Sequence, residues 1–186
     1  MMRLPCIIIP YICIKQKING MEKQDAALDI LKTAILLERK GKAFYTQAAK
    51  NCESKSAKRI FETMAEEEEE HLAFLTMQAQ SYVKNNHFIH PEAHTEDDTN
   101  GEIFTEQIKK EINAASYEAA AISAAIDFEN HAIKVYSARA KDASDPAEKE
   151  VYQMLADWER GHHHLLYRLS EELKEEIWND NNFWPF

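Results

Sequence analysis

Residues 64–72 read MAEEEEEHL. Such an acidic run commonly lies on the solvated face of a helix, but here the flanking residues recur at alternating spacings of three and four, as in a helix packed in a bundle. The residues with this spacing are Phe61, Met64, Leu75 and Gln78. The same seam passes through Glu68 and His71 and leaves out the other four glutamates. Glu68 and His71 lie one turn apart and are predicted to point into the core, where a charge is costly unless a cation lies nearby.

The composition is that of a helical, acidic protein. The 186-residue chain has the size of one domain with a substantial core. Its four glycines and five prolines are few, and abundant Ala, Glu, Lys and Leu favour long helices over strands. The formal charge of −10 argues against binding to nucleic acid or to an anionic membrane surface. Cys6, Cys13 and Cys52 form no CxxC pair and no disulfide framework, so we expect a reducing, cytoplasmic setting.

The first twenty residues differ from the rest of the chain. Residues 4–14 (LPCIIIPYICI) are apolar but fall far short of the roughly 20 residues that span a bilayer. Pro5 and Pro10 interrupt this stretch, and it has no small-residue cleavage site. We interpret residues 1–20 as a non-native or disordered extension, with Met21 as the true initiator. An export signal or a membrane tether is the alternative.

Apolar seams with helical spacing predict four long helices. The expected helices cover about residues 25–50, 56–83 and 115–142, and a fourth begins at 146. Short turns make the first two helices, and likewise the last two, antiparallel hairpins. Asp145 and Pro146 form the start signal of the fourth helix. The polar residues 85–101 are predicted to cross the length of the bundle, with a short helix near 104–113.

The two predicted hairpins repeat one another at a distance of 91 residues without a gap. The shift places Glu38 on Glu129, Tyr45 on Tyr136, Phe61 on Tyr152, Glu68 on Glu159 and His71 on His162. A repeated helical hairpin predicts a four-helix bundle with approximate two-fold symmetry. Each half then supplies a lone glutamate and a Glu-x-x-His to the interior.

These six inward groups predict a binuclear metal site. Four carboxylates carry a charge of −4 and two neutral imidazoles carry none, so two divalent ions make the site electrically neutral. Carboxylate and imidazole ligands suit iron or manganese, whereas zinc prefers fewer ligands in a tetrahedral arrangement. Buried ion pairs without metal are the alternative, but no Lys or Arg lies on the seams. Without metal, we expect the clustered carboxylates to have raised pKa values.

The sequence resembles the rubrerythrin branch of the ferritin-like superfamily. The resemblance covers about residues 25–170 and rests on AILLE…FY at 34–45, AEEEEEHL at 65–72 and AIxxE…Y at 125–136. It implies an all-α, ferritin-like four-helix bundle made of two hairpins joined by a long crossover. In such a bundle Glu68 and Glu159 would bridge two iron ions, Glu38 and Glu129 would each cap one, and His71 and His162 would each bind one. Manganese is the alternative metal.

The resemblance also gives Tyr45 and Tyr136 a site role, as tyrosines that hydrogen-bond carboxylates beside the metal ligands. Ordinary core tyrosines are the alternative.

Two features depart from the family pattern. Ala132 stands where rubrerythrins usually carry an extra carboxylate, and the chain has no rubredoxin domain with paired CxxC motifs. Glu69 stands where bacterioferritins have a haem-binding methionine, so no haem is expected.

Several other features receive a simpler interpretation. In the run 162–164 only His162 lies on the seam, and His131 points elsewhere. The loop histidines His87, His90 and His94 could form a secondary metal site, but a solvated loop is favoured. The bundle is assigned to residues 21–176. The aromatic tail, residues 177–186, is expected to dock onto the bundle or onto a neighbouring subunit.

The sequence therefore predicts a non-haem di-iron oxidoreductase that reduces hydrogen peroxide or dioxygen in oxidative-stress defence. Its electrons would come from a separate donor such as a rubredoxin or a flavoprotein, and we expect a homodimer. Iron handling, as a ferroxidase or a binding and storage protein, is the alternative. A third possibility is a bundle that binds metal but acts as an interaction protein.

Overall fold

The computed structural model describes residues 8–91 and 117–179, with side chains described for 26–91 and 117–175. These ranges contain four helices and no strand. The helices are α1 (Ile8–Asn51), α2 (Lys55–Asn85), α4 (Tyr117–Asp142) and α5 (Pro146–Asn179). The predicted all-α four-helix bundle is confirmed. Among the described helices, none combines the length and hydrophobicity needed to cross a membrane.

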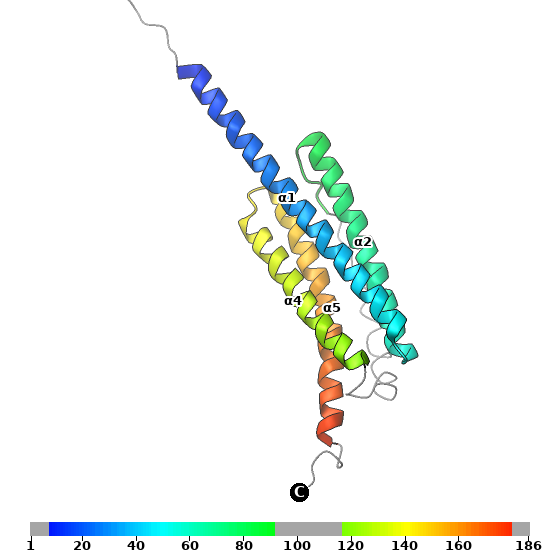
Figure 1. Ribbon diagram of the computed structural model, residues 1–186. Helices are drawn as coiled ribbons and strands as arrows, with labels where there is room; N and C mark the ends of the chain where they lie inside the picture. The colour runs from blue at the N-terminus through cyan, green and yellow to red at the C-terminus, as the bar shows by residue number, and fades with distance from the viewer. Residues whose placement is uncertain (1–7, 92–116, 180–186) are drawn as a thin grey trace, which may run out of the picture.

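Helices α1 and α2 form the first antiparallel hairpin (Figure 1). Ser54 caps α2, because its hydroxyl accepts a hydrogen bond from the Ala57 backbone N–H at 3.1 Å. The buried carboxylate of Glu118, in the first turn of α4, accepts hydrogen bonds from the backbone N–H groups of Glu53 and Ser54 at 2.7 and 3.0 Å. The turn of the first hairpin is thus tied to the start of the second.

Helices α4 and α5 form the second hairpin. Helix α5 begins at Pro146 as predicted, and the Asp145 carboxylate accepts a hydrogen bond from the Ala147 backbone N–H at 2.9 Å. Arg139, near the end of α4, donates from Nε and Nη2 to Glu148 in the first turn of α5. This pair joins the two helices beside their turn.

The two hairpins lie side by side, with α1 next to α4 (Figure 1). Helix α2 ends at one end of the bundle and α4 begins at the other (Figure 1). Residues 92–116 between them lie outside the described residues, so the predicted course of the crossover stays a prediction. Asn86 ends α2 in the left-handed conformation, with a φ of 57°. The buried side chain of Gln78 then holds the start of the connection through two hydrogen bonds of 2.9 Å with the backbone of Ile89.

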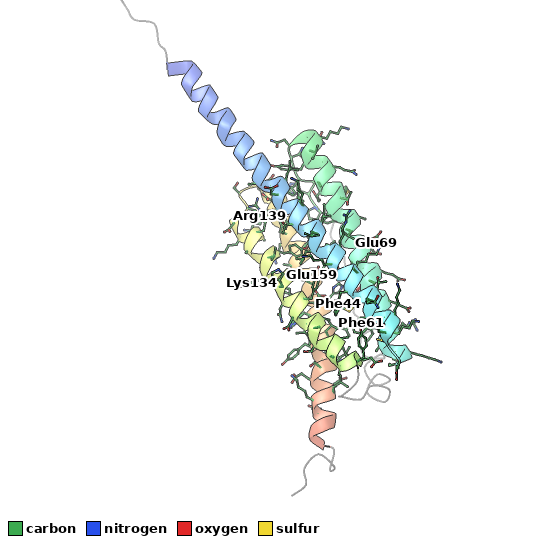
Figure 2. The ribbon with its side chains drawn as sticks, viewed as in Figure 1. Phe44, Phe61, Glu69, Lys134, Arg139 and Glu159 are labelled. Carbon is green, nitrogen blue, oxygen red and sulfur yellow. The ribbon has the colours of Figure 1, made fainter. Side chains whose placement is uncertain are left out.

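Two apolar layers fill the bundle interior. The first lies toward the α4–α5 turn and includes Leu31, Leu75, Phe88, Tyr152 and Leu155. The second lies toward the α1–α2 turn and includes Phe61, Met64, Ile122, Leu166 and Leu169. Figure 2 shows Glu159 near the middle of the bundle, with Arg139 toward one end and Phe61 toward the other. The predicted acidic groups therefore lie between two apolar layers.

The helix ends differ from the sequence prediction in two places. Helix α1 begins at Ile8 rather than near residue 25. Pro10 is compatible with this earlier start, because it falls in the first turn, where proline is tolerated. Helix α5 continues through Asn179, into the residues assigned to the aromatic tail. The predicted short helix at 104–113 and the tail residues 180–186 lie outside the described residues. The interpretation of residues 1–20 as an extension stays a prediction.

Candidate metal centre

The six predicted ligands converge in the middle of the bundle, and all six are buried. They form two overlapping groups whose possible ligand atoms lie within 4.8 Å of one another. The first group is Glu38, Glu68, His71 and Glu159, and the second is Glu68, Glu129, Glu159 and His162. Because Glu68 and Glu159 belong to both groups, they lie between two candidate metal positions. One capping glutamate and one histidine then serve each position.

Both histidines turn their Nδ1 atoms toward the carboxylates. His71 Nδ1 lies 3.2 Å from Glu38 and 3.3 Å from Glu159. His162 Nδ1 lies 3.3 Å from Glu159 and 3.6 Å from Glu129. The two imidazole rings face each other at a centroid separation of 5.5 Å. These matched contacts follow the two-fold symmetry that the repeat predicted.

The two tyrosines connect the halves reciprocally. Tyr45 donates a hydrogen bond to Glu129, and Tyr136 donates one to Glu38. Each tyrosine therefore holds the capping glutamate of the other hairpin. Both rings are fully buried, and burial together with the adjacent carboxylate raises the pKa of each phenol well above its usual value. Both phenols remain protonated donors at neutral pH.

The ligand groups contain many buried polar atoms that lack a hydrogen-bond partner. Within the described part of the chain, these include both carboxylate oxygens of Glu68 and of Glu159, Oε2 of Glu129 and Nδ1 of His162. Buried polar atoms are almost always satisfied in native proteins, and leaving one unpaired costs about 1–3 kcal/mol. Carboxylate oxygens and an imidazole nitrogen are also the ligands that iron and manganese take. The residues present therefore fit a binuclear metal centre.

Without a cation, protons take its place. Burial raises the pKa of Glu68 to about 10, with His71 acting against this rise and the Glu38 and Glu159 carboxylates adding to it. Burial raises the pKa of Glu129 to about 8, again against the effect of its neighbouring histidine. Both groups therefore carry protons at neutral pH when no metal is bound.

The histidines and Glu159 form ion pairs among these protonated acids. Burial disfavours an imidazolium, yet the surrounding carboxylates raise the pKa values of His71 and His162 well above the usual value. Burial also disfavours charge on Glu159, but its contacts with the two histidines outweigh burial and lower its pKa. The expectation that all the clustered carboxylates have raised pKa values is therefore wrong for Glu159. The histidines themselves provide the cations that the seams lack.

Gly41 allows the helices to approach at the site. A Cβ added at Gly41 would lie 2.7 Å from Glu68 Oε1 and 3.0 Å from Phe128 Cε1. Real Cβ atoms essentially never lie under 3.0 Å from a neighbour, so a side chain here would displace the shared carboxylate. This role was not predicted from the sequence, although a glycine on the predicted seam of the first helix, one turn after Glu38, was a signal for it.

Two further residues contact the histidines and were also missed. Glu67 Oε2 lies 3.0 Å from His162 Nε2, and the Trp158 ring stacks on His71 at a centroid separation of 4.6 Å. The 91-residue shift places Glu67 on Trp158, so this pair marks a difference between the two halves. By contrast, Glu69 points outward and pairs with Lys42 at 2.7 Å (Figure 2).

The other histidines within the described residues belong to neither group. His163 stacks on Tyr167 at a centroid separation of 5.9 Å, and His131 is exposed. His90 pairs with Glu150 at 2.7 Å, and His87 contacts the Asn85 backbone oxygen at 3.3 Å. The third loop histidine, at position 94, lies outside the described residues.

The model of the rubrerythrin family matches residues 29–170, which is more than half of the chain. The chain belongs to the rubrerythrin family. The resemblance noted in the sequence is thus confirmed, and with it the ferritin-like form of the four-helix bundle. The buried Glu and His groups of this rubrerythrin-family chain fit a di-iron site.

The comparison with solved structures supports the fold. A hypothetical protein from Pyrococcus furiosus is 20% identical and has a TM-score of 0.54. The similarity covers 80% of this chain and 90% of that one. No match was found among curated proteins.

Proposed function

We propose that this rubrerythrin-family chain is a non-haem di-iron oxidoreductase that reduces hydrogen peroxide or dioxygen in oxidative-stress defence. The observation that carries the proposal is the buried layer of four glutamates and two histidines, whose orphaned atoms face one another between two apolar layers. Two bound ferrous ions would supply the two electrons that, with two protons, reduce hydrogen peroxide to two molecules of water; full reduction of dioxygen would need two more electrons and two more protons, the electrons coming from the external donor. Glu68 and Glu159 would hold both ions, and the remaining four residues would hold one each.

The protein's own groups set the charge and the proton supply of the site. Glu68, Glu129, His71 and His162 hold protons in the metal-free chain, as their raised pKa values indicate. Cations that enter the site must displace these protons. The apolar layers keep bulk water away, which strengthens the electrostatic interactions inside.

Tyr45 and Tyr136 would fix the orientation of the two capping carboxylates. Each phenol donates to Oε1 of its glutamate. Oε2 of Glu129 has no hydrogen-bond partner and Oε2 of Glu38 contacts His71, so in both glutamates Oε2 faces the metal site. A donor in this place also keeps the carboxylate from rotating away from the metal position. We propose this positioning role for both tyrosines.

The proposal requires an electron source outside the chain. The three cysteines form no CxxC pair that could hold a rubredoxin-type iron site. We propose a separate rubredoxin or flavoprotein as the donor, and a cytoplasmic homodimer as the working form. Iron is favoured as the redox metal, with manganese as the alternative.

A ferroxidase or iron-storage function is the second candidate. Ala132 favours it, because this buried residue leaves the site without the extra carboxylate that rubrerythrins usually carry one turn after the third-helix glutamate. The six groups that remain are symmetric about the two metal positions. Such a set would also suit oxidation of ferrous ions that arrive as substrate.

One experiment separates the two functions. The iron-loaded chain is oxidised, mixed anaerobically with reduced rubredoxin and then supplied with peroxide, while reduction of the centre and loss of peroxide are followed. The peroxidase proposal predicts repeated turnover at a constant protein concentration. Oxidation of added ferrous iron without donor-driven turnover, together with assembly into a cage-sized particle, would support iron storage instead.

A further inference from the structure

The surroundings of the two histidines break the symmetry of the metal centre. On one side, His162 Nε2 lies 3.0 Å from Glu67 Oε2, and the Glu67 side chain is 47% exposed. On the other side, the repeat places Trp158 where Glu67 would lie. The Trp158 ring is nearly parallel to His71, at an angle of 7° and a centroid separation of 4.6 Å. Besides the carboxylates that face Nδ1 in both rings, His162 therefore contacts a further carboxylate at Nε2, whereas His71 stacks on an aromatic ring.

These contacts have different effects on a metal ligand. Both histidines face the acidic groups through Nδ1, so a metal-bound imidazole carries its proton on Nε2. In His162 this N–H donates to Glu67, which fixes the tautomer and increases the basicity of Nδ1. Stacking on Trp158 fixes the plane of His71, whose carboxylate contacts within the described part of the chain all face Nδ1 and not Nε2. The position served by His162 thus receives an additional negative charge and a more basic ligand.

We propose that Glu67 and Trp158 make the two metal positions inequivalent, with Glu67 a positioning residue that makes the Glu129–His162 position the tighter binding site. The inference rests on the proposed binuclear function and adds an order of filling to it. The first divalent cation enters the position of Glu129 and His162, and the second enters the position of Glu38 and His71. The shared glutamates, Glu68 and Glu159, contribute to both.

The test is a titration of the metal-free chain with Co²⁺, followed by calorimetry and by visible absorption. Cobalt binds to carboxylate and imidazole ligands, and its absorption reports ligation without any turnover. The unmodified chain should bind two ions in two steps of different affinity. Glu67→Ala should weaken the tighter step by about 10- to 100-fold, the usual effect of losing a carboxylate that supports a metal-bound histidine. The weaker step should change by less than about 3-fold, well below that range.

Matched variants assign the steps. Glu66→Ala removes the same charge from an exposed neighbour of Glu67 and should leave both steps unchanged. Glu67→Gln keeps a hydrogen-bond acceptor but no charge, so it should fall between the unmodified chain and the alanine variant. His162→Ala should abolish the step that Glu67→Ala weakens, whereas His71→Ala should abolish the other. Trp158→Glu should tighten the weaker step and bring the two affinities together.

The outcomes separate this inference from the proposed function. If the unmodified chain binds two ions but Glu67→Ala behaves like Glu66→Ala, the inference is wrong and the binuclear function stands. Equal weakening of both steps, or weakening of the step that depends on His71, also overturns the inference. A chain that binds no Co²⁺ overturns both.

Discussion

At the residue scale, Gly41 lets the α1 backbone lie close to the Glu68 carboxylate. Gly41→Ala places a Cβ 2.7 Å from Glu68 Oε1. Glu68 can move its carboxylate away, so the fold should persist, but the shared ligand is then displaced. We expect the affinity for Co²⁺ to fall by about 10- to 100-fold, as for the loss of other supporting contacts.

Gly161→Ala is the matched control for this prediction. Gly161 is exposed on α5, and alanine there should raise the free energy of unfolding by up to about 1 kcal/mol through helix propensity. Metal titration of both variants checks the prediction. Equal affinities for the two variants would show that Gly41 does not position Glu68.

The two tyrosines give a second prediction at this scale. Tyr45→Phe removes the phenol donor from Oε1 of Glu129, and Tyr136→Phe removes the phenol donor from Oε1 of Glu38. Each variant should lower the unfolding free energy of the metal-free chain by about 1–3 kcal/mol. Urea unfolding measures the loss. Tyr167→Phe, at an exposed position, is the control, and its unfolding free energy should lie within about 0.5 kcal/mol of that of the unmodified chain. A loss no larger than that of Tyr167→Phe in either variant would contradict the contribution of that phenol.

At the element scale, Glu118 joins the two hairpins. Its carboxylate accepts hydrogen bonds from two backbone N–H groups in the α1–α2 turn, so Glu118→Ala should lower the unfolding free energy by about 1.5–3 kcal/mol. Glu118→Gln keeps an acceptor and should lose less. Glu62→Ala, at an exposed position on α2, controls for lost surface charge. Urea unfolding that showed the alanine and glutamine variants of Glu118 to be equally stable would contradict this role.

The helices and their inward faces could be predicted because helical periodicity is a local property of the sequence. All four seams are buried as expected. The 91-residue repeat also correctly matched Tyr45 with Tyr136, because each hydrogen-bonds the capping glutamate of the other hairpin. The contacts of Glu67 and Glu118 could not be predicted, because each joins residues at least 64 positions apart through an orientation that only packing determines. The lowered pKa of Glu159 could not be predicted for the same reason, since it depends on how packing orients both histidines toward this carboxylate.

At the scale of the whole molecule, the metal-free centre makes stability depend on pH. The pKa values of Glu68 and Glu129 rise from 4.5 in the unfolded chain to about 10 and about 8 in the folded chain. The folded chain therefore binds the protons of Glu68 and Glu129 more tightly than the unfolded chain does. These protons stabilise the fold fully below about pH 4.5, and their contribution is lost as the pH rises toward 8 for Glu129 and 10 for Glu68. The pKa values of His71 and His162 are also raised in the folded chain, so the stabilisation from their protons is lost as the pH rises above 6.5. Glu159 has the opposite sign, and its contribution is lost only as the pH falls below 4.5.

We therefore expect the metal-free chain to lose stability as the pH rises from 6.5 to 8. The slope should be at least about 1.4 kcal/mol per pH unit, the value for one proton held only by the folded state. The metal-loaded chain should gain stability over the same range, because competing protons leave its ligands. Urea unfolding of both forms at several pH values measures the divergence. Glu68→Gln/Glu129→Gln should flatten the metal-free curve, and parallel curves for the two forms of the unmodified chain would contradict the prediction.

Four glutamates and two histidines of one chain are proposed to hold two metal ions, and an anaerobic titration with ferrous ions tests this proposal. Elemental analysis after removal of free iron counts the ions, and a pH-stat counts the protons that they displace. We predict two ions per chain and, at pH 7, about four protons, one each from Glu68, Glu129, His71 and His162. Glu68→Ala and Glu159→Ala should each lose most of both ions. Near-zero iron in the unmodified chain, or two ions retained in both variants, would contradict the claim.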